Sequence, residues 1–173
     1  MAAYHFYGIY PDAPSIIVPQ TIYSAQGSFY EDQAIRFTKG GVPVLLEEAR
    51  QSAHFGMDHG DMQPHMSTTA EKINLRIQWP GYDPWTKPVS VLEYDGPQGT
   101  RRISNAKLGH AIAKAVLEFY EAMSRYYSTA DRPDWDLSNI PFHCLRLFQL
   151  NHVAAGSWQP VLSYCKDSGE NTD

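Results

Sequence analysis

The sequence predicts a single α+β domain in which one long amphipathic helix covers one face of a β-grasp-like sheet. Apolar and polar residues alternate over 73–79, which is the period of a strand with one buried face. An apolar stripe with helical spacing follows at 108–126, and two apolar runs, 142–150 and 158–164, flank a short turn. The order hairpin, helix, hairpin is typical of a sheet covered on one side. The length of 173 residues suits one hydrophobic core.

The N-terminal region, residues 1–53, is rich in tyrosine and proline. Because proline cannot donate a hydrogen bond to a neighbouring strand, we expect extended, edge-like chain around the apolar run 15–18. Short β-favouring pieces occur at 28–37. Pro43 suits the first turn of a short helix that ends near Ala53.

Residues 54–70 lose hydrophobic periodicity and gain glycine, proline, serine and threonine, which predicts a loop. The α+β core then extends over 71–165. Its first hairpin has strands at 73–79 and 89–94. The turn residues 80–84 join them, because proline fixes φ and glycine supplies the positive φ of a tight turn.

The helix that follows is predicted from Ser104, a suitable N-cap whose side-chain oxygen can accept an orphan backbone amide. Its apolar stripe reaches Tyr126, and charged residues occupy the opposite side. The residues of the stripe are Leu108, Ala111, Ile112, Ala115, Phe119, Ala122 and Tyr126.

The second hairpin is predicted to turn at residues 154–157. We expect residues 166–173 to be a frayed polar tail. The predicted register gives chemically sensible cross-strand pairs. These are Leu145 with Tyr164, Leu147 with Leu162, and Cys144 with Cys165.

Charge and composition argue against several classes of function. The net charge of −5, from 14 basic and 19 acidic residues, gives no attraction to nucleic acid or to anionic lipid, so neither is an expected partner. No stretch approaches the roughly 18 apolar residues of a membrane span, and the N-terminus does not resemble a signal peptide. Two cysteines are too few for a disulfide framework. We therefore expect a cytoplasmic protein, with a nuclear location also open.

The loop is the one candidate for a metal site. Three histidines, two aspartates and three methionines fall within residues 54–66, and such side chains bind transition metals. The stretch also has the composition of a mobile, solvated loop, whereas metal ligands usually stand on rigid elements. The alternatives are no cofactor, or a divalent transition metal bound by His54, His59, His65, Asp58 and Asp61.

Enzyme signatures are missing from the chain. The motifs GxSxG, HExxH, Walker A and GxGxxG do not occur. Serine, histidine and aspartate could still meet in a triad, because triads are defined by geometry. Cys144 and Cys165 have apolar neighbours and are more often packed than reactive. The catalytic residues stay unknown, and the sequence favours a non-catalytic protein over an enzyme.

Aromatic residues, 13% of the chain, are the second candidate for a site. Trp79 and Trp158 continue inward stripes and are expected in the core. Tyr82 and Trp85 lie inside a predicted turn and are expected to form an exposed binding surface, since such rings dominate recognition surfaces.

Two segments carry a resemblance to other proteins. The stretch Leu75 to Tyr82, LRIQWPGY, and the stretch Gly156 to Pro160, GSWQP, resemble motifs in small uncharacterised proteins of mushroom-forming fungi. The resemblance covers roughly residues 72–164. It implies an intracellular fungal protein built around this unit, and it carries no activity or catalytic residue with it.

Three hypotheses for the function follow. The first is a non-catalytic interaction module that binds a protein partner or a second copy of itself, with Tyr82 and Trp85 in the contact surface. The second is a metal-binding protein or metal-dependent enzyme that uses the loop. The third, suggested by the resemblance and by the turn aromatics, is a cytoplasmic fungal lectin-like defence protein.

Overall fold

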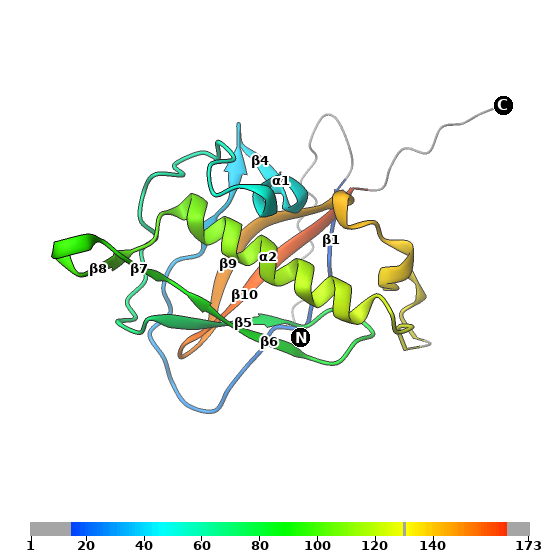
Figure 1. Ribbon diagram of the computed structural model, residues 1–173. Helices are drawn as coiled ribbons and strands as arrows, with labels where there is room; N and C mark the ends of the chain where they lie inside the picture. The colour runs from blue at the N-terminus through cyan, green and yellow to red at the C-terminus, as the bar shows by residue number, and fades with distance from the viewer. Residues whose placement is uncertain (1–14, 130, 166–173) are drawn as a thin grey trace.

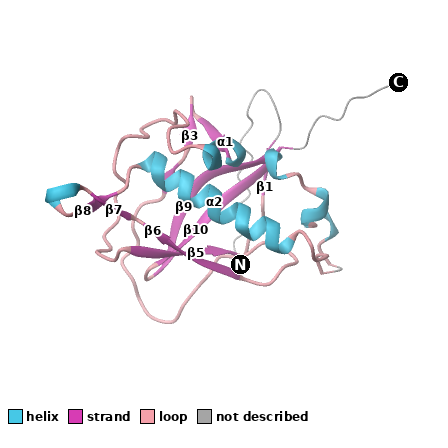
Figure 2. Ribbon diagram, in the orientation of Figure 1, coloured by secondary structure: helices cyan, strands magenta, loops and turns pink. Residues whose placement is uncertain are grey.

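The computed structural model describes residues 15–129 and 131–165 (Figure 1). Its long helix, α2, lies across a twisted sheet, as Figure 2 shows. The helices are α1 (Leu46–Gln51) and α2 (Asn105–Met123), with short 3₁₀ turns η1 (Gly96–Gln98), η2 (Pro133–Trp135), η3 (Leu137–Asn139) and η4 (Phe142–Cys144). The strands are β1 (Ser15–Ile17), β2 (Ile35–Arg36), β3 (Thr38–Lys39), β4 (Val42–Leu45), β5 (Lys72–Ile77), β6 (Trp85–Ser90), β7 (Leu92–Tyr94), β8 (Thr100–Arg102), β9 (Leu145–Ala154) and β10 (Ser157–Cys165).

The main sheet has the order β3-β4-β9-β10-β5-β6, with β1 also paired to β10 and β2 to β9. The first strand of the first hairpin, β5, runs parallel to the last strand, β10, and every other pairing is antiparallel. The α+β, β-grasp-like prediction is therefore confirmed. A separate two-stranded sheet, β7–β8, was not predicted.

The register of the β9–β10 hairpin confirms two of the three predicted pairs. Leu145 lies opposite Tyr164 and Leu147 opposite Leu162. The third pair is wrong because β9 begins only at Leu145: Cys144 lies in η4, and Cys165 is in register with Ser15 of β1. Cys144 and Cys165 do not form a disulfide bond with each other.

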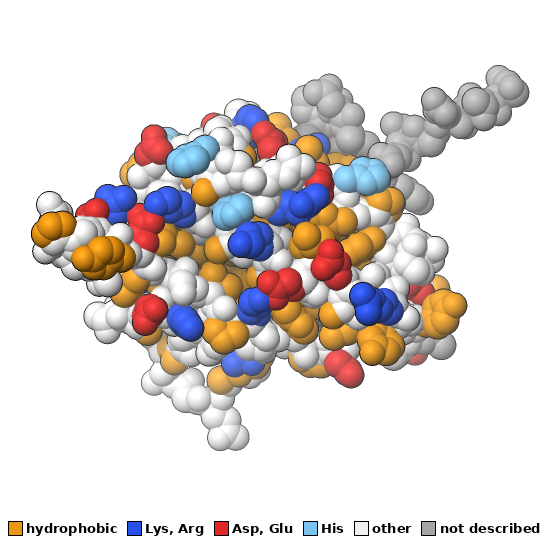
Figure 3. Space-filling model, in the orientation of Figure 1, with side chains coloured by type: hydrophobic (Ala, Val, Ile, Leu, Met, Phe, Trp, Pro, Cys, Tyr) orange, Lys and Arg blue, Asp and Glu red, His pale blue; other side chains and the backbone are white. Residues whose placement is uncertain are grey.

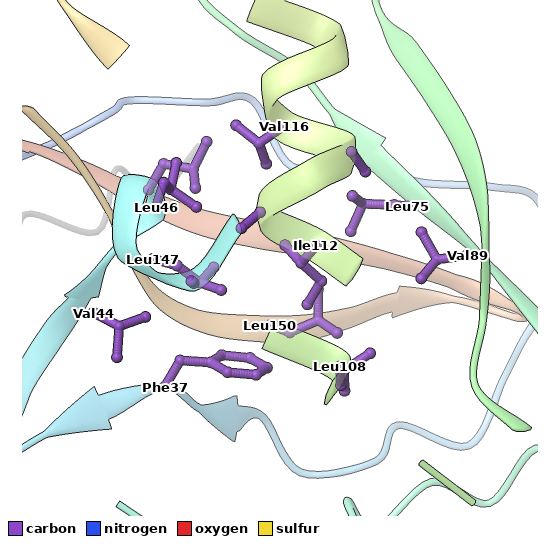
Figure 4. Close-up of a cluster of buried hydrophobic side chains, with 14 of the residues drawn as sticks. Phe37, Val44, Leu46, Leu75, Val89, Leu108, Ile112, Val116, Leu147 and Leu150 are labelled. Atoms are coloured by element: carbon purple, nitrogen blue, oxygen red, sulfur yellow. The ribbon is translucent and has the colours of Figure 1, made fainter. Parts of the chain in front are cut away.

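The hydrophobic core lies between α2 and one face of the sheet (Figure 4). Leu75, Ile112 and Leu147 are fully buried there. At Gly109 the helix comes so close to its neighbours that an added Cβ would lie 3.0 Å from Phe37 and 3.2 Å from Phe55. The absent side chain therefore lets α2 pack tightly against the core.

Helix α2 begins as predicted and ends early. The Ser104 side chain accepts a hydrogen bond from the Lys107 backbone amide, which confirms the N-cap. The predicted end of the apolar stripe is wrong. The helix ends at Met123, Ala122 is exposed and Tyr126 is 66% exposed.

Two other boundaries differ from the prediction. Pro43 lies within β4, opposite Thr38, and the short helix α1 starts three residues later. The predicted strand 89–94 is split at Val91, whose amide donates to Glu71 O and whose carbonyl accepts from Ile103 N. The chain therefore leaves the main sheet at Val91 and enters the β7–β8 hairpin.

A glutamine side chain fills the gap where β5 and β10 diverge. These strands pair only at the start of β10, Ser157 with Asn74 and Trp158 with Leu75. Farther along, Gln20 Nε2 donates to Pro160 O at 2.6 Å and Gln20 Oε1 accepts from Gln78 N at 2.9 Å. The primary amide thus acts as a bridge between the two backbones. No helix among the described residues is long and apolar enough to cross a membrane.

Candidate functional site

The predicted contact residues Tyr82 and Trp85 form contacts with other residues of the protein. Both are half-buried and pack against the core. The Trp85 ring meets Phe119 of α2 edge to face, with ring centroids 5.8 Å apart. The strand register places Trp85 opposite Ile77, so its ring belongs to the helix-covered side of the sheet.

The Tyr82 hydroxyl joins three segments of chain. It accepts a hydrogen bond from Leu137 N at 3.0 Å and is a donor to Tyr126 O at 3.1 Å, with Asp136 Oδ1 at 3.3 Å. Burial, the largest cause, raises the pKa of Tyr82. The hydroxyl therefore stays protonated and holds the chain after α2 against the β5–β6 turn.

The histidine-rich loop does not gather its predicted ligands. His54, His59 and His65 are exposed, as is Asp61. In the described part of the chain, no group of three or more His, Cys, Asp or Glu side chains is arranged to hold a metal ion.

Asp58 has a structural partner instead. Its carboxylate accepts hydrogen bonds from Gly41 N at 2.9 Å, Gly40 N at 3.0 Å and Thr38 Oγ1 at 2.9 Å. These hydrogen bonds lower the pKa of Asp58, and the bonds from Gly41 and Gly40 have the largest effect. The carboxylate therefore fixes the β3–β4 turn.

A serine, an aspartate and a histidine do meet, from three distant parts of the sequence. Asp32 and His152 are buried, and Ser67 lies at the surface. Asp32 Oδ2 accepts from Ser67 N at 2.9 Å and from Ser67 Oγ at 3.0 Å. Asp32 N donates to His152 Nδ1 at 3.0 Å.

This arrangement does not activate the serine as a nucleophile. In a hydrolase triad the imidazole accepts the serine proton, whereas here the Ser67 hydroxyl donates to the carboxylate. The imidazole of His152 stacks on Trp158 at 4.4 Å, and Phe29 packs edge-on against it at 4.9 Å. The cluster therefore ties the segment around Asp32 to β9 and β10.

The β7–β8 hairpin projects from the body of the protein (Figure 1). We call residues 92–102 the arm. Tyr94 is 80% exposed, and no residue of the η1 turn at its tip is buried. Figure 3 shows hydrophobic side chains at the end of this projection. The exposed apolar residues of the arm are Tyr94 and Pro97.

Ion pairs, and not a hydrophobic core, hold the arm. Glu93 accepts from Arg101 Nε at 2.9 Å and pairs with Lys107 at the start of α2. Arg101 also lies 3.7 Å from Asp95 Oδ2. The hydrogen bond from Lys107, and then that from Arg101, lowers the pKa of Glu93. At its base Ile103 is buried and Arg102 Nη2 donates to Thr68 O.

The outer edges of the arm are open to hydrogen bonding. Ile103 N donates to Val91 O at 3.1 Å and Asp95 N to Gly99 O at 2.6 Å. Bonded and non-bonded pairs alternate in an antiparallel ladder. The backbone groups of Leu92 and Tyr94 therefore point away from β8, along a free edge.

The exposed edge of the main sheet is different in character. Strand β6 is the last strand on that side, and it carries Lys87 and Pro88. Proline lacks the backbone donor, and charge on an edge opposes strand addition. Strand addition is thus disfavoured at β6, in contrast to β7.

Comparison of the chain with family models, with curated proteins and with solved structures found no match.

The arm is not among the sites predicted from the sequence, although the sequence contains a signal for it. Glu93 and Arg101 have opposite charges and lie at equal distances from Pro97, as cross-strand partners do. Residues 95–97 have a composition that is typical of the end of a strand. The same residues, with Gly96 and Gly99 at positive φ, also form the tip of a hairpin.

Proposed function

We propose that the protein is a non-catalytic interaction module whose arm contacts a protein partner. The observation that carries the proposal is the exposure of Tyr94 and Pro97 on a hairpin that is held in place by ion pairs. A two-stranded hairpin alone is only marginally stable in water. The contacts from Lys107 and Arg102 hold this one against the body, although its tip buries nothing.

The chemistry of the arm suits recognition. Tyrosine offers a large contact area and a polar hydroxyl, and it loses little conformational entropy on binding. The free edge at Leu92 and Tyr94 offers backbone donors and acceptors to an extended segment of the partner. Both features lie on one short hairpin, so one partner segment can use them together.

Site-specific photo-crosslinking tests this proposal. A benzophenone amino acid replaces Tyr94 in one variant and Tyr127, 87% exposed on the chain after α2, in a control variant. Each purified variant is irradiated in extract of the cells that make the protein. We expect a discrete crosslinked protein from position 94 and none of that mass from position 127.

Two outcomes would contradict the proposal. One is the same crosslinking pattern from both positions, which would indicate non-specific collision. The other is no adduct from position 94 at any protein concentration that gives adducts elsewhere. An adduct with twice the mass of the chain would identify the partner as a second copy.

A further inference from the structure

We propose that Arg76, on the face of the sheet opposite α2, forms a binding site for a single carboxylate. The proposal goes beyond the arm, because β5 positions the site and none of the arm residues takes part in it. In β5 the side chains of Ile73, Leu75 and Ile77 are buried toward the helix. Alternation therefore directs Arg76 to the other face.

The Arg76 guanidinium is held by neutral groups. Its Nε donates to Ser157 Oγ at 3.2 Å, and its Nη1 donates to Thr86 Oγ1 at 2.8 Å. Its Cζ lies 4.1 Å from the centre of the Tyr23 ring, a cation–π contact. Among the described residues no carboxylate forms an ion pair with Arg76.

Tyr23 is itself fixed by the sheet. Its backbone amide donates to Gln159 Oε1 at 2.9 Å, and Gln159 Nε2 donates to Thr21 O at 2.9 Å. Gln159 is 5% exposed, so its amide cannot move freely. The ring and the guanidinium are thus positioned before any ligand arrives, which lowers the entropic cost of binding.

Donors remain for a ligand. A guanidinium has five N–H groups, and two of those of Arg76 go to Ser157 and Thr86. Both N–H groups on Nη2 are among those left. A carboxylate matches the spacing of two guanidinium nitrogens and binds them with two parallel hydrogen bonds.

The surroundings favour one negative charge over several. The positions on β5, β6 and β10 that share the face of Arg76 include no aspartate or glutamate to repel an anion. The same positions hold one other cation, Lys72, four residues away along β5. A phosphate dianion usually requires more positive charge than one guanidinium supplies, and the chain has a net charge of −5. The site therefore fits a monoanionic carboxylate with neutral polar neighbours.

The test is a titration of the full chain followed by NMR of the arginine Nε–H groups at constant ionic strength. The probes are N-acetylglycine, which carries a chain-terminal carboxylate, N-acetylaspartate amide, which carries a side-chain carboxylate, and inorganic phosphate. We expect a saturable shift of the Arg76 Nε–H with at least one carboxylate, at concentrations on the order of 1–100 mM for so small a ligand. The tighter carboxylate identifies the source of the group.

Variants make the test specific. Arg76→Gln is expected to abolish the saturable response, measured then on the Ser157 amide. Arg36→Gln, at an exposed arginine of β2, is the matched control and should leave the response unchanged. Arg76→Lys keeps the positive charge but loses the planar guanidinium that can donate two parallel hydrogen bonds. We therefore expect about tenfold weaker binding of the carboxylate. The Arg76→Lys variant also provides the test if Arg76→Gln does not fold.

Three results would overturn the proposal. The first is a shift that rises linearly with every probe, as for a solvent-exposed arginine. The second is tighter binding of phosphate than of both carboxylates. The third is an unchanged saturable response in Arg76→Gln or in Arg76→Lys.

Discussion

Two hairpins of this protein carry aromatic residues at or near their turns. In one hairpin these side chains pack inside the protein, and in the other the aromatic side chain is exposed. In the β5–β6 hairpin, Tyr82 and Trp85 are directed into the protein, against Phe119 and the chain after α2. In the β7–β8 hairpin, Tyr94 is 80% exposed. The difference lies in what covers each turn. Phe119 of α2, Tyr126 and residues 136–137 cover the first, and no described element packs on the tip of the second.

The comparison shows that the role of a turn aromatic depends on distant chain. The residues that engage Tyr82 lie 44 to 55 positions away in sequence. Nothing in the local sequence around Pro80–Trp85 indicates that these distant residues contact the turn. The interaction hypothesis therefore moves from this turn to the arm, while the predicted fold is confirmed.

The largest expected effect is at the base of the covered turn. Trp79 is 1% exposed, contacts Phe119 and Trp135, and donates from Nε1 to Trp135 O at 2.8 Å. We expect Trp79→Ala to lower the free energy of unfolding by about 3–5 kcal/mol, because it leaves a large cavity. Urea denaturation followed by circular dichroism measures it. A loss below about 1 kcal/mol would show that this turn is not an anchored part of the core.

A matched pair of glycine substitutions compares the two turns directly. Gly81 has φ +85°, and an added Cβ would lie 2.9 Å from Ser128 Cβ. Gly96, at the arm tip, has φ +57° and nothing within 4 Å. We expect Gly81→Ala to cost about 2–4 kcal/mol from strain and overlap together, and Gly96→Ala about 1 kcal/mol from strain alone. Equal losses in urea unfolding would remove the distinction.

Acid is expected to loosen the arm. Since the pKa of Glu93 is lowered below its ordinary value of 4.5 in the folded protein, its ion pairs stabilise the arm above that pH. This stability is lost as the pH falls through the lowered pKa. Amide hydrogen exchange at Arg101 should accelerate, relative to Leu75 in β5, in that range.

The control for the acid experiment is Glu93→Gln, which cannot form the ion pairs. Its arm should exchange quickly at every pH, without the acid transition. An identical pH profile in this variant and in the parent would assign the change to other carboxylates.

Much of the fold could be predicted because its signals are local. The turn at 154–157 sets the β9–β10 register, and the alternation at 73–79 and the cap at Ser104 identify the main elements. The end of α2 could not be placed, because the apolar stripe continues in sequence to Tyr126 after the helix has ended.

The candidate sites were harder to predict because they depend on long-range contacts. Asp32 and His152 are 120 residues apart, and Tyr23, whose backbone amide donates to Gln159, contacts Arg76 from a distant part of the sequence. The predicted metal ligands failed to meet for a similar reason: Asp58 turns to the backbone of the β3–β4 turn. The arm, in contrast, has a local signal in the sequence, the opposite charges of Glu93 and Arg101 on either side of its tip.

We propose that the arm serves contact with a partner and that the covered turn serves stability. The most direct test compares Tyr94→Ser with Tyr82→Phe, each measured for urea unfolding and for binding of the protein crosslinked at position 94. We predict that Tyr94→Ser weakens binding at least tenfold and changes stability by less than about 0.5 kcal/mol. Tyr82→Phe should lose about 1–2 kcal/mol of stability and bind as the parent does. The reverse pattern, with binding lost in Tyr82→Phe and retained in Tyr94→Ser, would contradict this division of roles between the arm and the covered turn.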